Sequence, residues 1–325
     1  MNRKVISVLV CVLLAVSMLA AGCGSSGETG NTSAPAKVFI NIATGGTSGT
    51  YFPLGGALGE IWNKNIPGMN ATAQSTGASV ANVNLLNDGK ADVIMVQNDI
   101  AYYAVNGTEM FNNKKVDGMV GLASLYPETI QIVAKEDQKI KSIADLKGKK
   151  VAVGAAGSGT EANARQILEA AGITYKDITV QYLSFAEAAS NLKDGNVDAA
   201  FLTAGHPTAA VQDIAAQHKI QILPIKDDLA DKIIAKYPFY TKVVVGADTY
   251  KGMTAESKTL AVQAMLVVSS KMDDKMAYDL VKYMYGNLDR IKAAHKVGEQ
   301  ITKDNGTAGM PITLHPGAEK FFSGN

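Results

Sequence analysis

The sequence predicts an α/β protein built from two homologous units, each a mainly parallel sheet flanked by helices. Three observations lead to this prediction. Apolar strand-like runs alternate with helical patterns, glycine-rich loops at 45–56 and 154–160 each follow such a run, and one segment is repeated, as LNDGKADV at 86–93 and LKDGNVDA at 192–199. Alternation of this kind requires right-handed crossovers between parallel strands, and ligands of such sheets bind beyond the carboxyl ends of the strands.

The first unit begins with an apolar run that alternates like a strand. The predicted elements are a strand at 38–43, a helix that ends near residue 65, a strand at 71–74, a helix at 79–87 and a strand at 91–96. Pro53 suits the first turn of the first helix. Ser79 is expected to be the N-cap of the second helix, which the Asn-Asp-Gly sequence at 87–89 ends. The last strand leads through polar residues at 97–99 into another helix.

The second unit repeats this order. The predicted elements are a strand at 149–153, the second glycine loop, a helix at 161–171, a strand at 178–183, a helix at 185–192 and a strand at 197–202. Ile167 and Leu168 are spaced to face the core from the first of these helices. Polar residues at 203–207 follow the last strand. If the two units face each other, both glycine loops and both sets of polar residues line one cleft.

The segments between and after the units predict how the chain crosses between them. Extended apolar stretches at 121–126 and 129–134, interrupted at Pro127, indicate a crossing strand or hinge, and a return crossing is expected at 220–225 or 237–245. Apolar residues at 257–295 recur at helical spacings, which predicts helices that close the first domain. The expected domains are therefore 37–127 plus about 241–325, and about 128–240.

The N-terminus has the pattern of a secretory signal. Positive charge at Arg3 and Lys4 precedes an apolar run at 5–21, so we predict a signal peptide at 1–22. The small residues before Cys23 resemble the bacterial lipoprotein cleavage site, which predicts a lipidated Cys23, a flexible tether at 23–36 and an extracytoplasmic protein anchored to the membrane. Ordinary cleavage with a free Cys23 is the alternative, because Leu19 lies one place further from the cysteine than usual.

Composition argues against several functions. The chain has 31 basic and 30 acidic residues, and no basic run interleaved with aromatic residues follows the predicted signal, so nucleic-acid binding is not expected. Of the two cysteines, one lies inside the predicted signal, which leaves no pair for a disulfide or a cysteine cluster. No His-x-x-x-His pattern or carboxylate cluster indicates a metal site. We expect no cofactor, no metal and a monomer.

A loose dinucleotide fingerprint offers one enzymatic alternative. Gly157, Gly159 and Ala162 have its spacing after a strand. The fingerprint also needs an acidic residue at the end of the next strand, whereas here the nearest acid, Glu187, falls inside a predicted helix. We therefore do not favour an oxidoreductase.

A secreted hydrolase is the second enzymatic alternative. Ser48 or Ser158 at a sharp turn would be the nucleophile, with His206 or His315 as the base. No Gly-x-Ser-x-Gly elbow occurs in the sequence, so this alternative is weak.

The predicted cleft is poor in arginine. Arg165, on the helix after the second glycine loop, is the one credible clamp for a carboxylate, and an ordinary ion pair is the alternative. Backbone N–H groups at helix N-termini, hydroxyls and amides are then the expected lining. Such a lining suits a small carboxylate-bearing solute, because helix N-termini balance negative charge without a formal counter-charge.

Five stretches together resemble the TAXI group of solute-binding receptors, which serve TRAP transporters. They span nearly the whole chain after the predicted signal and tether: 42–51 (IATGGTSGTY), 75–82 (STGASVAN), 92–99 (DVIMVQND), 157–161 (GSGTE) and 315–318 (HPGA). The resemblance implies a two-domain fold like that of the type II periplasmic binding proteins, with crossing strands as the hinge. It also implies ligands similar to glutamate or glutamine and delivery to a TRAP-type membrane permease.

The same resemblance implies which residues bind the ligand. One wall of the cleft is expected to contain Thr47, Ser48, Tyr51, Ser75, Thr76 and Asn98. The other is expected to contain Gly157, Ser158, Thr160, Ala204 and Gly205. For Tyr51, packing of its helix is the alternative role. We therefore predict a non-enzymatic receptor for a small carboxylate, with a binding protein of an ABC importer or a chemosensor as the alternatives of the same class.

Overall fold

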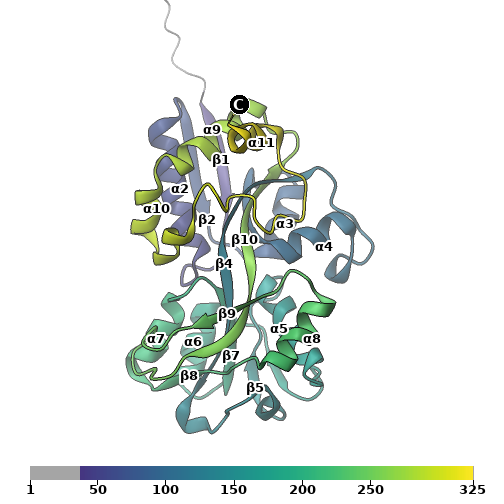
Figure 1. Cartoon of the computed structure of the whole chain (residues 1–325), viewed down its shortest axis with the longest axis vertical. Helices are drawn as coiled ribbons and strands as arrows, with labels where there is room; N and C mark the ends of the chain where they lie inside the picture. Colours follow the sequence, from purple (N-terminus) through teal and green to yellow (C-terminus); the bar gives the residue numbers. More distant parts are fainter. Residues whose placement is uncertain (1–36, 325) are drawn as a thin grey trace, which may run out of the picture. The chain divides into compact units, whose positions relative to one another are not determined.

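The computed structural model describes residues 37–324 (Figure 1). The signal peptide predicted at 1–22, the predicted lipidation of Cys23 and the tether predicted at 23–36 lie outside the described residues. Within residues 37–324, no helix combines the length and the apolar character that crossing a membrane requires.

The two halves of the chain contain the same arrangement of three parallel strands joined by helices. The first half consists of β1 (Val38–Ala43), α2 (Tyr51–Asn65), β2 (Met69–Gln74), α3 (Ser79–Asn87), β3 (Val93–Gln97) and α4 (Asn98–Asn106). The second consists of β5 (Lys150–Ala152), α5 (Gly159–Ala170), β6 (Thr179–Gln181), α6 (Phe185–Lys193), β7 (Ala199–Ala204) and α7 (Ala209–Gln217). In each half the first strand lies between the other two.

A long antiparallel pair of strands joins the halves into one mixed sheet. This pair is β4 (Met119–Lys135) with β10 (Ser257–Ser269), and the strand order is β2-β1-β3-β10-β4-β7-β5-β6. In Figure 1 the two strands run side by side from the first half, in the upper part of the view, into the second half below it. The α/β class and the two homologous units predicted from the repeat are confirmed, although the strands form one continuous sheet. The domain limits at 127 and 240 remain a prediction.

The remaining elements cover the sheet or extend its sides. The regular ones are β8 (Ile220–Ile222), α8 (Asp227–Lys236), β9 (Thr241–Val245), α9 (Asp274–Tyr285), α10 (Leu288–Ala294) and α11 (Pro316–Ser323). Four 3-10 helices lie at Glu109–Phe111, Glu136–Gln138, Ile143–Leu146 and Lys296–Gln300. The Trp62 indole N–H donates to the Leu280 carbonyl at 3.0 Å, which fixes α9 on α2. Helices α9 and α10 therefore pack on α2 of the first half.

Equivalent aspartates have the same structural role in the two halves. The Asp92 carboxylate accepts the Asn41 N–H of β1 at 2.8 Å, and the Asp198 carboxylate accepts the Lys150 N–H of β5, also at 2.8 Å. Each aspartate follows a glycine with positive φ by three residues, Gly89 with a φ of 68° and Gly195 with a φ of 77°. The repeated segment is thus a helix-to-strand turn that anchors the first strand of each half.

The prediction that residues 257–295 form helices was wrong for the first part of this segment. Ser257–Ser269 is strand β10, which pairs with β3 and β4 on its two sides. Leu260, Ala264, Leu266 and Val267 are all buried. Because both faces of this central strand are covered, its apolar residues do not alternate with polar ones, and the run imitates the spacing of a buried helix.

The crossings between the halves also differ from the expectation. The stretches on either side of Pro127 are one continuous strand, β4, with a register shift near this residue. The return crossing is made by β10. The segments expected to supply it contain short strands at the side of the sheet, β8 paired with β4 and β9 paired with β10.

Candidate functional site

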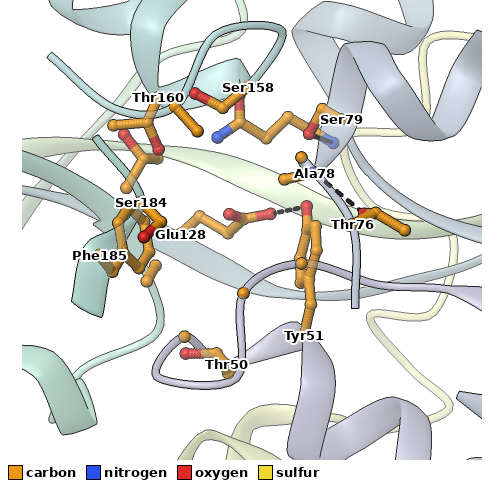
Figure 2. Close-up of a pocket in the computed structure, with 18 of the residues that line it drawn as sticks. Thr50, Tyr51, Thr76, Ala78, Ser79, Glu128, Ser158, Thr160, Ser184 and Phe185 are labelled. Atoms are coloured by element: carbon orange, nitrogen blue, oxygen red, sulfur yellow. Dashed lines mark hydrogen bonds between the residues drawn. The ribbon is translucent and has the colours of Figure 1, made fainter. Parts of the chain in front are cut away.

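A cavity of about 70 Å³ lies where the two halves meet, at the carboxyl ends of β1, β3 and β7 (Figure 2). Both glycine loops contribute to it, as predicted. The first half supplies Gly45, Gly46, Gly49, Thr50, Tyr51, Thr76, Gly77, Ala78, Ser79 and Gln97, the crossing strand β4 supplies Tyr126 and Glu128, and the second half supplies Ala155, Ser158, Thr160, Ser184, Phe185, Thr203 and Ala204.

Four helices begin at this cavity. They are α2, α3, α5 and α6, whose first residues or caps belong to the lining. The first N–H groups of a helix have no partner within it, and its N-terminus carries a partial positive charge. Of the residues that the structure describes, 37–324, no Lys, Arg or His lines the cavity. The electropositive character of the site therefore comes from backbone N–H groups.

The start of α3 differs from the expectation in one respect. Ala78, with a φ of 69°, occupies the N-cap position in place of Ser79. Ser79 is the first helical residue, and its hydroxyl accepts the Gln97 backbone N–H at 3.2 Å. This bond connects α3 to the end of β3, so both elements present their ends to the cavity together.

Asn82 on α3 fixes the walls of the first half. Its amide nitrogen donates to the carbonyls of Thr44 at 2.6 Å and Met95 at 2.8 Å, and its oxygen accepts the Thr76 hydroxyl at 2.6 Å. The side chain is fully buried. One amide thus connects the ends of β1 and β3 with the loop that carries Thr76, which makes this wall rigid.

Glu128 is the acidic residue of the lining. It is 2% exposed, and the Tyr51 hydroxyl donates to its carboxylate. Figure 2 shows the carboxylate between Ser184 and Phe185 on one side and Tyr51 on the other. Burial raises the pKa of Glu128 to about 8, although hydrogen bonds from Tyr51 and Gln97 lower it in part. The carboxyl group is therefore largely neutral at pH 7.

Three polar atoms of the lining have no hydrogen-bond partner within the described part of the chain. They are Gln97 Oε1, the Tyr126 hydroxyl and Thr203 Oγ1. All three side chains are at most 4% exposed. Buried polar groups in folded proteins are nearly always paired with protein or with ordered water, so these three atoms are available to hydrogen-bond a solute or water in the cavity.

The predicted binding residues divide into two groups in the structure. Tyr51, Thr76, Ser158, Thr160 and Ala204 line the cavity. Of these, Ser158 also caps α5, where its hydroxyl accepts the Glu161 N–H at 3.1 Å. Tyr51 does more than pack its helix, since its hydroxyl reaches Glu128.

The other six predicted residues lie outside the lining. They are Thr47, Ser48, Ser75, Asn98, Gly157 and Gly205. Thr47 and Ser75 are exposed to solvent. The Asn98 side chain instead contacts the C-terminal segment and β10, donating to the Gly309 carbonyl at 3.1 Å and accepting the Gln263 N–H at 3.0 Å.

The remaining three of the six connect the halves through their backbone carbonyls. The Gly157 carbonyl accepts the Ala81 N–H at 3.1 Å, and the Ser48 carbonyl accepts the Ala210 N–H at 3.3 Å. The Gly205 carbonyl accepts the Thr50 hydroxyl at 3.1 Å. These bonds join the two glycine loops to the opposite half beside the cavity.

Arg165 does not belong to the cavity. Its guanidinium pairs with Glu109 at 3.4 Å and with Glu161 at 3.8 Å. Of the two roles considered for it, the ordinary ion pair is the one observed.

The histidines of the hydrolase alternative have other partners. His206 Nδ1 lies 2.9 Å from the Thr129 hydroxyl. His315 is fully buried, caps α11 by accepting the Gly317 N–H, and contacts the Met272 carbonyl at 3.0 Å. Within residues 37–324, no hydrogen bond joins a serine to a histidine. The geometry of a Ser-His pair is therefore not present.

Sequence reasoning missed the residues at the centre of the cavity. Glu128, Gln97, Tyr126 and Thr203 were not among the predicted binding residues. The available signal was a lone acidic residue inside a long apolar run, since Glu128 is the one acid between residues 119 and 135. A charge in such a position is rarely buried without a function or a partner.

Comparisons with known proteins add a family and a fold. A sequence profile of the NMT1-like family matches residues 42–324. A protein of Escherichia coli (strain K12) named "Putative aliphatic sulfonates-binding protein" is 39% identical over 80 residues, which are 25% of this chain and 25% of that protein. This match therefore spans only a quarter of the length of the relative.

Two solved structures extend the comparison to most of the chain. The alkanesulfonate-binding protein SsuA of Xanthomonas axonopodis pv. citri, bound to MOPS, is 18% identical with a TM-score of 0.51, over 89% of this chain and 84% of that chain. A protein of Listeria monocytogenes named "Putative L-Cystine ABC transporter" is 15% identical with a TM-score of 0.50, over 82% of this chain and 99% of that chain. At these identities the likeness concerns the fold.

Proposed function

The chain belongs to the NMT1-like family and has the α/β fold of the type II periplasmic binding proteins, and from this premise we propose that it is an extracytoplasmic solute-binding receptor without enzymatic activity. The observation that carries the proposal is the cavity between the halves, where three buried polar atoms have no hydrogen-bond partner within the described residues. Both halves contribute to this lining. Capture therefore depends on both at once, as in receptors that close around a solute.

We propose a small acid as the ligand. The cavity between the halves is small, and four helix N-termini favour a negative group. A glutamate-like carboxylate is the ligand class implied by the sequence resemblance. The sulfonates in the name of the E. coli relative add a second class of anionic solute. Tyr51, Thr76, Ser158, Thr160 and Ala204 stay proposed contacts.

We propose an ABC importer as the membrane partner. The support is the Listeria neighbour, which is named as an ABC transporter. A TRAP-type permease, implied by the five sequence motifs, is the second candidate. Transport of the captured solute by candidate permeases in proteoliposomes distinguishes the two, because the first requires ATP and the second an ion gradient.

We also propose that a lipid on Cys23 anchors the receptor to the membrane.

A thermal-shift screen tests the receptor function. Purified protein is heated with amino acids, dicarboxylates and sulfonates. A true ligand at a hundred times its dissociation constant stabilises the folded state by about 2.7 kcal/mol, which raises the melting temperature by roughly 4 to 5 °C for a protein of this size. The ligand must be recovered unchanged. Absence of any saturable shift contradicts the proposal, and consumption of the ligand indicates an enzyme instead.

Gly159→Ala is expected to weaken binding of the ligand found in this screen about tenfold. A Cβ at Gly159 clashes with the Gln97 amide, whose side chain is flexible and must turn out of its place in the cavity. The melting temperature of the free protein changes little. Isothermal titration calorimetry measures the affinity.

Gly56→Ala is the matched control, because a Cβ there meets nothing within 4 Å. It lies inside α2, where alanine is the better helix former, so slight stabilisation with unchanged affinity is expected. Equal affinities of the two variants contradict a role of Gln97 in binding.

A further inference from the structure

We infer that the cavity captures its acidic solute together with one proton, and that Glu128 holds this proton and donates it in a hydrogen bond to the acid group of the solute. This inference rests on the proposed receptor function and on the proposed acid ligand, and it adds the protonation state in which the two acids meet. The charges in the cavity lead to it, because positive charge for one anion is available to two acidic groups.

The cavity contains an acidic side chain before any solute enters. Glu128 is 2% exposed, and the Tyr51 hydroxyl donates to its Oε1 (Figure 2). Among residues 37–324, the lining includes no Lys, Arg or His that could pair with the Glu128 carboxylate. Two carboxyl groups that lie close together in a buried site share one proton, because ionising both brings like charges together. An acidic solute beside Glu128 creates this situation.

The helix N-termini supply positive charge for one anion. Helices α5 and α6 each carry an acidic residue in the first turn, Glu161 and Glu187, which offsets the partial charge of their ends. Helices α2 and α3 carry none there, and about half an elementary charge at each of these two N-termini gives a total of about one. The carboxylate or sulfonate of a solute takes up this charge. An ionised Glu128 is then a second buried anion without a counter-charge, which is costly.

The hydrogen-bonding groups of the cavity suit a neutral Glu128. Because the Tyr51 hydroxyl donates to Oε1, the proton of the neutral carboxyl group lies on Oε2 and is available for donation. The Tyr126 and Thr203 hydroxyls, which have no partner within the described residues, are further donors. These groups can all donate to the oxygens of one acid group. An O–H donor to an anionic oxygen makes a charge-assisted hydrogen bond, about twice as strong as a neutral one.

The titratable neighbours of Glu128 also favour its neutral form. They are Tyr51 of α2, Tyr126 of β4 and Asp99 of α4, and none of them is a cation. The polar side chains that the second half adds to the lining are hydroxyls, on Ser158, Thr160, Ser184 and Thr203. Burial and the nearby Asp99 raise the pKa of Glu128 to about 8 in the free protein, and an anionic solute raises it further. Above this pH, capture takes a proton from the solvent onto the carboxylate.

The pH dependence of the affinity tests the inference. For the full chain as purified, titration calorimetry is run at pH 7 and pH 9 with L-glutamate, glutarate and ethanesulfonate, whose acid groups stay ionised at both values. A group with a pKa of about 8 is about nine-tenths protonated at pH 7 and about one-tenth at pH 9, so the Kd of a solute that binds is expected to rise about tenfold. At pH 8, titration in buffers of different ionisation enthalpy is expected to show uptake of about half a proton per solute. Circular dichroism checks that the protein stays folded at each pH.

Variants identify the residue that holds the proton. Glu128→Gln keeps the shape and an N–H donor but does not titrate, and it is expected to reduce the change in Kd between pH 7 and pH 9 to less than about twofold. Glu136→Gln, at an exposed acid just after the same strand, is expected to retain the change of about tenfold.

Each other result has a defined meaning. A Kd that stays constant or falls from pH 7 to pH 9, or release of a proton at pH 8, overturns the inference while the receptor function stands. A rise of about tenfold that persists in Glu128→Gln overturns the assignment to Glu128. If this variant does not fold, proton uptake by the unaltered protein still decides whether a proton is captured. Binding of none of the three solutes at 10 mM, a limit chosen well above roughly 1 mM affinities, overturns the inference, and the receptor function falls only if the wider thermal-shift screen also fails.

Discussion

Replacing Asn163 with Ala is expected to lower the free energy of unfolding by about 3 kcal/mol. Asn163 on α5 is fully buried, and its amide nitrogen donates to Asp99 on α4 and to the Tyr240 hydroxyl, each at 2.9 Å. The Tyr240 hydroxyl donates in turn to the Gln166 side chain at 2.6 Å. This network connects α4 of the first half with α5 of the second.

Stability is lost because the substitution leaves two buried groups, the Asp99 carboxyl and the Tyr240 hydroxyl, without the hydrogen bond from Asn163. Asp99 retains a hydrogen bond from the Ile100 N–H at 2.8 Å but loses the bond that crosses to the other half. Removing one partner of a buried hydrogen bond costs the desolvation of the other, and more when that group is a carboxyl. Urea unfolding followed by circular dichroism measures the loss.

The exposed Asn106 at the end of α4 provides the control. Its amide donates only to the Tyr102 carbonyl, at 2.9 Å, and Asn106→Ala is expected to change the free energy by less than about 0.5 kcal/mol. If Asn163→Ala is as mild as this control, the network does not stabilise the packing of the two halves.

The repeated architecture was predictable because it depends on local patterns. Two local patterns carry it: glycine-rich loops that follow apolar runs, and two copies of the helix-to-strand turn that ends in Asp92 and Asp198. Both patterns can be recognised in the sequence without knowing the tertiary fold. The central strand β10 was not predictable in this way. Burial on both faces removes the alternation that identifies a strand, so its type depends on its neighbours β3 and β4.

The binding loops were predictable, but the individual contacts were not. A glycine-rich loop such as 45–50 presents adjacent residues in different directions, so Thr47 is exposed while Thr50 lines the cavity. The position of Glu128 depends on which face of β4 it occupies, and its proximity to Tyr51 arises across 77 positions of sequence. Contacts between residues this far apart in the sequence depend on how the two halves pack, and no local sequence pattern predicts that packing.

The free protein is expected to lose about 2 kcal/mol of folding free energy as the pH rises from 6.5 to 8. Burial raises the pKa of Glu128 to about 8 and that of Asp99 to about 7. Both carboxyls are already ionised in the unfolded chain at these pH values, because their ordinary pKa lies near 4. The folded state therefore binds more protons than the unfolded state, and stability falls as the pH rises through the folded-state pKa values.

Histidines oppose this trend most strongly at the lower end of the window and below it. Burial lowers the pKa of both His206 and His295, so their protonation favours the unfolded state below about pH 6.5. Urea unfolding in the upper part of the window, from about pH 7.5 to 8, therefore reports mainly on the carboxyl groups, and Glu128→Gln is expected to remove most of the slope there. A stability that is constant or rises over the window contradicts the burial of a neutral Glu128.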